Sequence, residues 1–201
     1  MKRHVPLLTA IVFAGSTVLM AQAPTTTKPS AAHEGDHAKA STADQDFAKK
    51  VAAGGEAEVQ VTELAQQKAT SNDVKDLASR LHTDHMKAND ELKKVASQKG
   101  WTLPTEPTAE QKAKKEKLEK LSGSAFDKEF VNMMVTNHRA NIPNFEREAA
   151  RGSDADLKRF ASSIVPTLKE HLEMAQKVQK SLGGASASSK SGTSSKPGYG
   201  K

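Results

Sequence analysis

In two long stretches of this sequence, apolar residues and one histidine recur with an alternating spacing of four and three residues. The first repeat consists of Val74, Ala78, Leu81, His85, Ala88, Leu92 and Val95. The second consists of Leu157, Ala161, Ile164, Leu168, His171, Ala175, Val178 and Leu182. This spacing places the repeated residues on one stripe of an α-helix, with charged residues on the other faces. Because such a stripe is buried against other helices, the pattern predicts a helical bundle.

Capping residues, glycines and prolines divide the chain into four long helices and one short helix. The expected helices cover residues 42–69, 72–100, 108–121, 124–151 and 154–182. Ser71 offers an N-cap oxygen to the second helix, and Gly100 is a natural C-terminal residue for it. The turns at Thr70-Ser71 and Gly152-Ser153 are short enough to make the joined helices antiparallel, and the longer connection between them allows a crossing. We expect an all-α, antiparallel four-helix bundle with a short extra helix between helices two and three.

The two ends of the chain differ from this core. Lys2 and Arg3 precede an apolar stretch that ends at Ala21-Gln22-Ala23, which is the pattern of a signal peptide over residues 1–23, cleaved after Ala23 or Ala21. Residues 24–41 read as a flexible leader, residues 42–182 as the bundle domain, and residues 183–201 as a disordered Gly/Ser/Lys tail. No stop-transfer segment follows, so we expect a periplasmic protein without a transmembrane span in the mature chain.

Composition removes several classes of function. The chain has no cysteine, which rules out thiol catalysis, thiolate metal sites and iron–sulfur clusters. Its net charge is +6, but Lys2, Arg3 and the three lysines of the tail account for five of these charges, which leaves about +1 for the folded part. A nucleic-acid-binding domain concentrates basic and aromatic residues on its folded surface. We therefore expect no nucleic-acid partner.

Each long helix places an ionisable residue on its apolar stripe. Glu58 interrupts the first stripe, His85 the second, His138 the third and His171 the fourth. If both short turns lie at the same end of the bundle, a rise of about 1.5 Å per residue puts these groups roughly 18 to 27 Å from that end. The sequence therefore predicts a Glu/His layer inside the bundle.

Such a layer has three physical interpretations. The groups can form a hydrogen-bonded polar layer that fixes helix register, they can bind a transition metal, or they can transfer protons. Imidazole and carboxylate together are a normal ligand set for zinc, copper or iron. No predicted helix contains the Glu-x-x-His motif of di-iron proteins, which disfavours an oxidase of that type. Glu58, His85, His138 and His171 are the candidate metal ligands.

Other polar residues are weaker candidates. His82 lies one turn before His85 but off the stripe, so we expect it to be solvated. Glu146 belongs to a charged run and is expected at the surface. His33 and His37 in the leader form at most an adventitious metal site.

A family resemblance rests on residues spread between about Asp44 and Val178. They are Asp46-Phe47, Gly54-Gly55, Glu58-Val59, Leu64-Ala65, Lys68-Ala69, Asp84-His85, Ala88, Leu92, His138, Phe145, Glu146, Ala149, Pro166-Thr167-Leu168 and His171-Leu172. In these residues the chain resembles an exported bacterial family known as domain of unknown function 4142. The resemblance implies a ferritin-like four-helix fold and an envelope location, and it implies no activity.

The recurrent residues of that family correspond to Glu58, His85, His138 and His171. Asn137 stands where the family commonly has an acidic residue, and this weakens the case for a metal second shell on that helix. Pro143 is a further departure.

These observations predict a periplasmic, non-enzymatic helical bundle that binds metal or acts in envelope stress. The alternative is a structural or interaction module whose basic tail, with Lys190, Lys196 and Lys201, makes weak contact with anionic envelope surfaces. A redox or hydrolytic enzyme is the least favoured reading, because the sequence has no nucleophile–base spacing.

Overall fold

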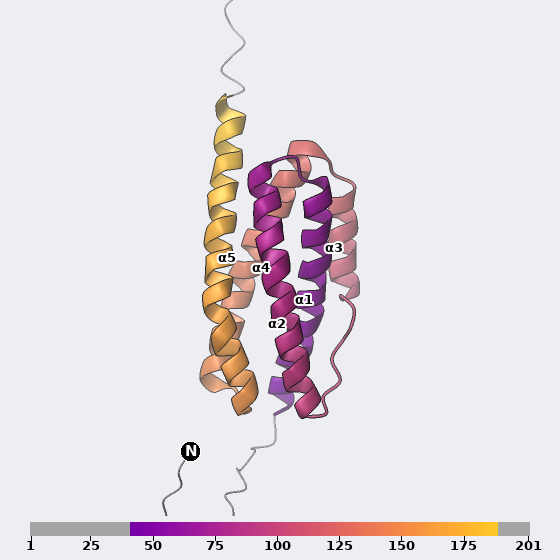
Figure 1. Ribbon diagram of the computed structural model, residues 1–201, viewed down its shortest axis with the longest axis vertical. Coiled ribbons are helices and arrows are strands. Elements are labelled where there is room, and N and C mark those ends of the chain that lie inside the picture. The colour runs from indigo at the N-terminus through magenta and orange to yellow at the C-terminus, as the bar shows by residue number, and fades with distance from the viewer. Residues whose placement is uncertain (1–40, 189–201) are drawn as a thin grey trace, which may run out of the picture. The chain divides into compact units, whose positions relative to one another are not determined.

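The computed structural model describes residues 41–188, and this part of the chain is all-α (Figure 1). The five helices are α1 (Thr42–Lys68), α2 (Asn72–Gln98), α3 (Ala109–Glu119), α4 (Gly123–Arg151) and α5 (Ala155–Ser188). These bounds confirm the four long helices and the short extra one that the sequence predicts. The predicted signal peptide, the part of the predicted leader with His33 and His37, and the tail lysines lie outside the described residues. None of the described helices is long and apolar enough to cross a membrane.

Local sequence explains three of the helix ends. Ser41 begins α1 with a capping box, in which its hydroxyl accepts the Asp44 N–H and the Asp44 carboxylate accepts the Ser41 N–H. Thr108 begins α3 in the same way with Gln111. Gly100, two residues beyond the end of α2, has a φ of 67°, a conformation that favours glycine.

The start of α2 departs from expectation. Ser71 is its N-cap residue by position, but the Ser71 side chain makes no capping hydrogen bond. The buried Asp127 carboxylate of α4 accepts instead from the Thr70 N–H at 3.0 Å, the Thr70 hydroxyl at 2.6 Å and the Ser71 N–H at 2.9 Å. The α1–α2 turn is therefore fastened by a residue more than fifty positions away in the sequence.

The end of α5 is also different. The helix continues to Ser188, beyond the end at Leu182 that the glycine pair predicts. A glycine commonly ends a helix by adopting positive φ, and among the described glycines only Gly100 and Gly123 have a positive φ. Gly183 stays helical, so the chain keeps its direction through the pair.

A second buried aspartate sets the direction of the helices. Asp44, in the first turn of α1, accepts hydrogen bonds of 3.1 Å from the N–H groups of Ser153 and Asp154 in the α4–α5 turn. Asp127, at the start of α4, holds the α1–α2 turn. The two short turns therefore lie at opposite ends of the bundle, as Figure 1 shows, and the assumption that they share one end is wrong.

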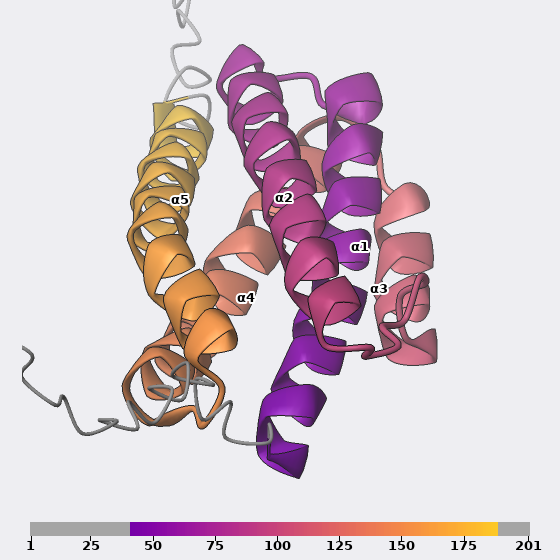
Figure 2. The same ribbon diagram turned by 60° about the horizontal axis from the view of Figure 1, so that its bottom comes forward.

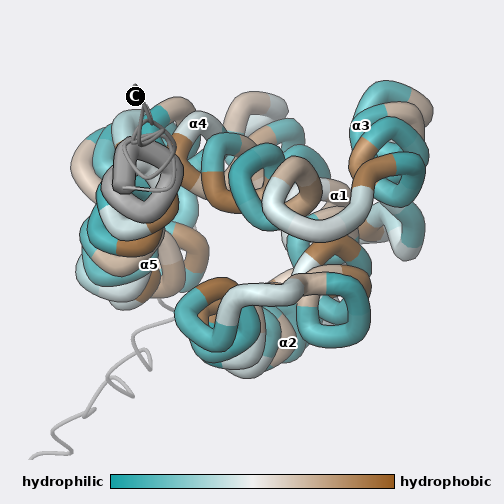
Figure 3. Tube along the Cα trace, turned by 90° about the horizontal axis from the view of Figure 1, so that it is seen from above, coloured by the Kyte–Doolittle hydropathy of each residue, from teal (hydrophilic) through white to brown (hydrophobic). Residues whose placement is uncertain are grey.

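Packing between the helices is uneven. Contacts are most extensive between α4 and α5 and between α1 and α2, intermediate between α2 and α5, and sparse between α1 and α4. In Figure 2, α1 and α2 form one hairpin and α4 and α5 the other. Seen from above in Figure 3, the short α3 lies outside the four long helices, beside α1. The loosely packed side between α1 and α4 is where the pocket described below opens.

The hydrophobic core has two separate parts. One cluster includes Val61, Leu81, Phe130 and Met134, and the other includes Leu92, Phe145, Leu157 and Leu168. On each long helix, a short segment separates the residues of one cluster from those of the other. These segments contain Glu58, His85, His138 and His171. A polar layer thus divides the apolar interior, as the sequence predicts.

Candidate metal centre

Three of the four predicted residues come together in the polar layer. One ring nitrogen from each of His85, His138 and His171 lies within 4.8 Å of the others. The ring centroids are 5.3 to 5.7 Å apart. The rings meet although the two turns lie at opposite ends, because each histidine stands near the middle of a helix of similar length. Each histidine is therefore at nearly the same distance from both ends of its helix.

His138 is oriented by its own helix. Its ring is buried, with 2% of the residue exposed, and Nδ1 lies 2.9 Å from the Met134 carbonyl oxygen one turn earlier. A carbonyl oxygen only accepts hydrogen bonds, so Nδ1 carries the proton. The lone pair of neutral His138 is therefore on Nε2.

His171 is oriented by α2. Its ring is 1% exposed, and Nε2 lies 2.9 Å from a carboxylate oxygen of Asp84. Asp84 is itself held by the Arg80 guanidinium at 2.6 Å. Burial acts to raise the pKa of Asp84, but the hydrogen bonds from His171 and Arg80 bring it below its ordinary value. Asp84 stays an acceptor, so His171 is protonated on Nε2 and its lone pair lies on Nδ1.

The two lone pairs face each other. His138 Nε2 and His171 Nδ1 are 3.3 Å apart. With both outer nitrogens already donating, a stable contact between these inner atoms needs a proton or a metal cation. Burial lowers the pKa of His171, which disfavours the proton. Two nitrogens at about 2.05 Å from a tetrahedral zinc ion are themselves about 3.3 Å apart.

His85 completes the group. Its residue is partly exposed, but its Nε2 is buried and has no hydrogen-bond partner among the described residues. Burial lowers the pKa of His85 to about 4, although the nearby Glu58 carboxylate acts in the opposite direction. The ring is therefore neutral at physiological pH, and one of its two nitrogens has a lone pair available to a metal ion.

Glu58 lies beside the histidines and is not part of the group. It is 8% exposed, and one of its carboxylate oxygens accepts a 2.9 Å hydrogen bond from the Asn137 side-chain amide. Its other oxygen is buried without a partner among the described residues. Asn137, one residue before His138, thus holds Glu58.

The sequence did not identify Asp84 and Met134 as partners of the histidines. Asp84 is adjacent to His85 and one turn after Arg80, but it does not belong to the apolar stripe of α2. Nothing local indicates that its carboxylate reaches α5. The Met134 carbonyl lies one turn before His138, which is a spacing that could have suggested the bond.

The secondary candidates lie elsewhere. His82 is partly buried, and its Nδ1 is 3.2 Å from the Thr62 hydroxyl, so it packs against α1. Glu146 is exposed and forms a 2.7 Å ion pair with Lys169, as expected for a surface residue. Neither residue belongs to the three-histidine group.

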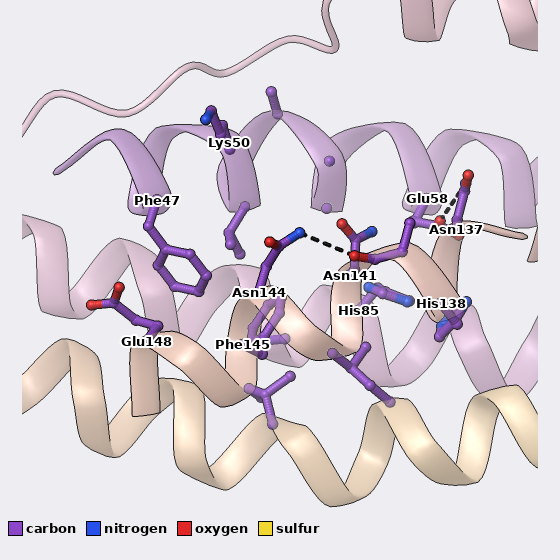
Figure 4. Close-up of a pocket in the computed structure, with 18 of the residues that line it drawn as sticks. Phe47, Lys50, Glu58, His85, Asn137, His138, Asn141, Asn144, Phe145 and Glu148 are labelled. Carbon is purple, nitrogen blue, oxygen red and sulfur yellow. Dashed lines mark hydrogen bonds between the residues drawn. The ribbon is translucent and has the colours of Figure 1, made fainter. Parts of the chain in front are cut away.

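A pocket of about 730 Å³ between α1 and α4 reaches His85 and His138 (Figure 4). Glu58, His85 and His138 stand at one end of the view, and Phe47 and Glu148 stand at the other. Three buried side-chain oxygen or nitrogen atoms in the described part of the chain have no hydrogen-bond partner, and they belong to Glu58, His85 and Glu148. All three residues line this pocket.

The fold and the histidine group define a helical protein with a three-imidazole centre in its core. Its sequence matches the family model named domain of unknown function (DUF4142) over residues 28–178. The chain belongs to this family. No curated protein is significantly similar to it.

Solved structures with a similar fold come from another family. A DUF305 fragment from Deinococcus radiodurans has a TM-score of 0.63 and 13% identity, over 70% of this chain and 97% of that one. A second structure is a DUF305 protein from Streptomyces coelicolor, whose name describes it as secreted. It has a TM-score of 0.61 and 15% identity, over 70% of this chain and 92% of that one. At such low identity these likenesses concern the fold alone.

Proposed function

We propose that this protein binds a transition metal ion through His85, His138 and His171, with Glu58 beside the ion. The observation that carries the proposal is the 3.3 Å separation of His138 Nε2 and His171 Nδ1, both of which present lone pairs. A hydrogen-bonded polar layer would pair a donor with an acceptor at this contact. The outer nitrogens bond to a backbone carbonyl and a carboxylate, which is the usual support of metal-bound histidines.

The ligand set narrows the choice of metal. Imidazole suits zinc, copper and iron, whereas magnesium and calcium prefer oxygen ligands. Three neutral imidazoles with an open fourth position resemble the ligand set of catalytic zinc centres. Zn²⁺ is therefore the first ion to test, and Cu²⁺ the second.

The setting of this centre is an exported protein with a ferritin-like arrangement of its four long helices. The basic and apolar start of the chain and its A-x-A pattern support export to the periplasm. The single long connection, which carries α3 between α2 and α4, supports the ferritin-like arrangement. Handling of a metal in the envelope is the role that joins these features.

The test is a Zn²⁺ titration of untagged protein that has first been freed of metal. We expect one equivalent to bind to the unaltered protein, and His138→Ala to reduce the affinity at least a hundredfold. His82→Ala is the matched control, because His82 is also a partly buried histidine of this bundle and lies outside the group. Equal binding by the protein and both variants, or no binding by any of them, would refute the proposal.

A further inference from the structure

The position of Glu58 relative to the histidines goes beyond metal binding. Its free oxygen is buried, lacks a donor and belongs to the lining of the pocket. The Glu58 carboxylate lies outside the 4.8 Å group formed by the three histidines. A water molecule on the open position of the ion would supply the missing hydrogen-bond donor.

Access to that water is built into α1. Gly54 lies one turn before Glu58 and lines the same pocket. A Cβ atom at Gly54 would meet only the Gln111 side-chain nitrogen of α3, at 3.9 Å. Because Gly54 has no side chain, nothing from this position of α1 projects toward Gln111 in the lining of the pocket.

The rest of the pocket indicates what such a molecule looks like. The part away from the histidines is mixed in character. The Phe145 ring lies 5.1 Å from Phe47 and 6.3 Å from Phe160 between centroids, and Lys50 and Glu148 also line this end (Figure 4). Asn141 and Asn144 supply amides along the α4 side. A pocket of about 730 Å³ with a group of aromatic rings and amide groups suits an acyl compound of modest size.

We propose that this centre hydrolyses esters with short apolar acyl chains, with Glu58 as the general base for a metal-bound water. This inference rests on the proposed metal binding. The three neutral imidazoles leave the charge of the ion available to polarise water. Glu58 is the carboxylate positioned to accept a proton from it. This reaction needs no side-chain nucleophile.

The reaction consumes only water. The water oxygen forms a bond to the ester carbonyl carbon while one of its protons moves to Glu58. The bond between that carbon and the leaving oxygen then breaks with its electron pair on the oxygen, and Glu58 returns the proton to it. The products are a carboxylic acid and an alcohol, and neither the protein nor the ion changes oxidation state.

The experiment measures the hydrolysis of 4-nitrophenyl butyrate by the Zn²⁺-loaded full chain, together with its zinc content. Glu58→Gln is expected to lower kcat at least tenfold and to retain one equivalent of zinc. The matched control is Glu146→Gln, an exposed glutamate outside the pocket, which should leave kcat unchanged. A second variant, Gly54→Leu, fills the approach and should raise KM or abolish turnover, also with zinc retained.

The outcomes separate the two proposals. If zinc binds but the unaltered protein shows no zinc-dependent turnover, the hydrolytic inference is overturned and the metal site stands. The same holds if Glu58→Gln and Gly54→Leu both turn over the ester as fast as the unaltered protein does. If Glu58→Gln folds but loses zinc, Glu58 is a ligand and the inference is overturned as well. If the unaltered protein binds no zinc, the proposed function falls and the inference falls with it.

Discussion

At the scale of single residues, the centre depends on two hydrogen bonds that point away from it. The Met134 carbonyl fixes the proton of His138 on Nδ1, and the Asp84 carboxylate fixes that of His171 on Nε2. Exchanging the Asp84 carboxylate for a donor would turn the His171 lone pair away from the shared space. The ligands and their orienting groups therefore act as one unit.

Asp84→Asn should weaken metal binding without removing a ligand. The asparagine lacks the negative charge that holds the His171 N–H and supports its basicity, so we expect a 10- to 100-fold loss of Zn²⁺ affinity. A competition titration against a chromophoric chelator measures this loss. Asp90→Asn, an exposed aspartate on the same helix, is the control. An affinity for Asp84→Asn equal to that of the control would contradict the role given to Asp84.

The sequence predicts the histidines and leaves their partners undetermined. His85 and His171 interrupt regular apolar stripes, so their burial follows from helix periodicity. Asp84 is one position from the stripe of α2, and its contact with His171 depends on how α2 and α5 are rotated against each other. That rotation is set by packing across the bundle, which one sequence does not specify.

At the scale of the helices, α1 is adapted to close packing on one side and to an open pocket on the other. Gly55 is buried against α2, where a Cβ atom would lie 1.9 Å from the Asn89 side-chain oxygen. A Cβ atom at the adjacent Gly54 would make only an ordinary van der Waals contact, at 3.9 Å from the Gln111 side-chain nitrogen. Two neighbouring glycines in one helix thus have different reasons to lack a side chain.

This difference predicts opposite effects of the same substitution. Gly54→Ala should stabilise the protein by up to about 1 kcal/mol, because alanine is the better helix former and finds room. Gly55→Ala should destabilise it, because Asn89 must leave its buried position. Thermal unfolding followed by circular dichroism compares the two variants directly. A melting temperature for Gly55→Ala at or above that of Gly54→Ala would show that the contact between a Cβ atom at position 55 and Asn89 does not lower the stability.

Helix ends show where local sequence is sufficient. The capping boxes at Ser41 and Thr108 are encoded within four residues, and they form as the pattern predicts. The start of α2 carries equally good local signals at Ser71, yet Asp127 of α4 provides the hydrogen bonds. Local capping is replaced where a buried carboxylate from another helix reaches the same amides.

At the scale of the whole molecule, the two ends of the bundle are fastened in the same way. Asp127 ties the α1–α2 turn to α4, and Asp44 ties the α4–α5 turn to α1. The sequence shows both turns but not which ends they share, because short loops constrain only the helices that they join. The long connection through α3 decides the matter, and its path has no local signature.

The end held by Asp44 also contains a buried carboxyl group with a raised pKa, that of Glu148. Burial, together with the charges of Asp44 and Asp154, raises the pKa of Glu148 to about 7. The folded protein keeps this proton where the unfolded chain, with an ordinary value of 4.5, has lost it. The contribution of Glu148 to stability therefore falls as the pH rises from about 4.5 through about 7, since the folded state must then carry a buried charge at this residue.

Glu148→Gln removes this dependence, because the amide is neutral at every pH. We expect the variant to melt at a higher temperature than the unaltered protein at pH 8 and the difference to vanish below about pH 4.5. Thermal melts of both proteins across this range, in metal-free buffer, provide the measurement. A difference that is the same at pH 4 and pH 8 would show that the Glu148 carboxyl does not titrate between the folded and unfolded states in this way.

The central claim is that the lone pairs of His138 and His171 face each other before any metal arrives. Long-range proton–nitrogen correlation NMR spectra of the metal-free, ¹⁵N-labelled protein report the tautomer of each imidazole. We predict His138 protonated on Nδ1 and His171 on Nε2, with one equivalent of Zn²⁺ shifting the nitrogen signals of His138, His171 and His85 and leaving those of His82 unchanged. The opposite tautomer at either His138 or His171, or signals that ignore added zinc, would contradict the account.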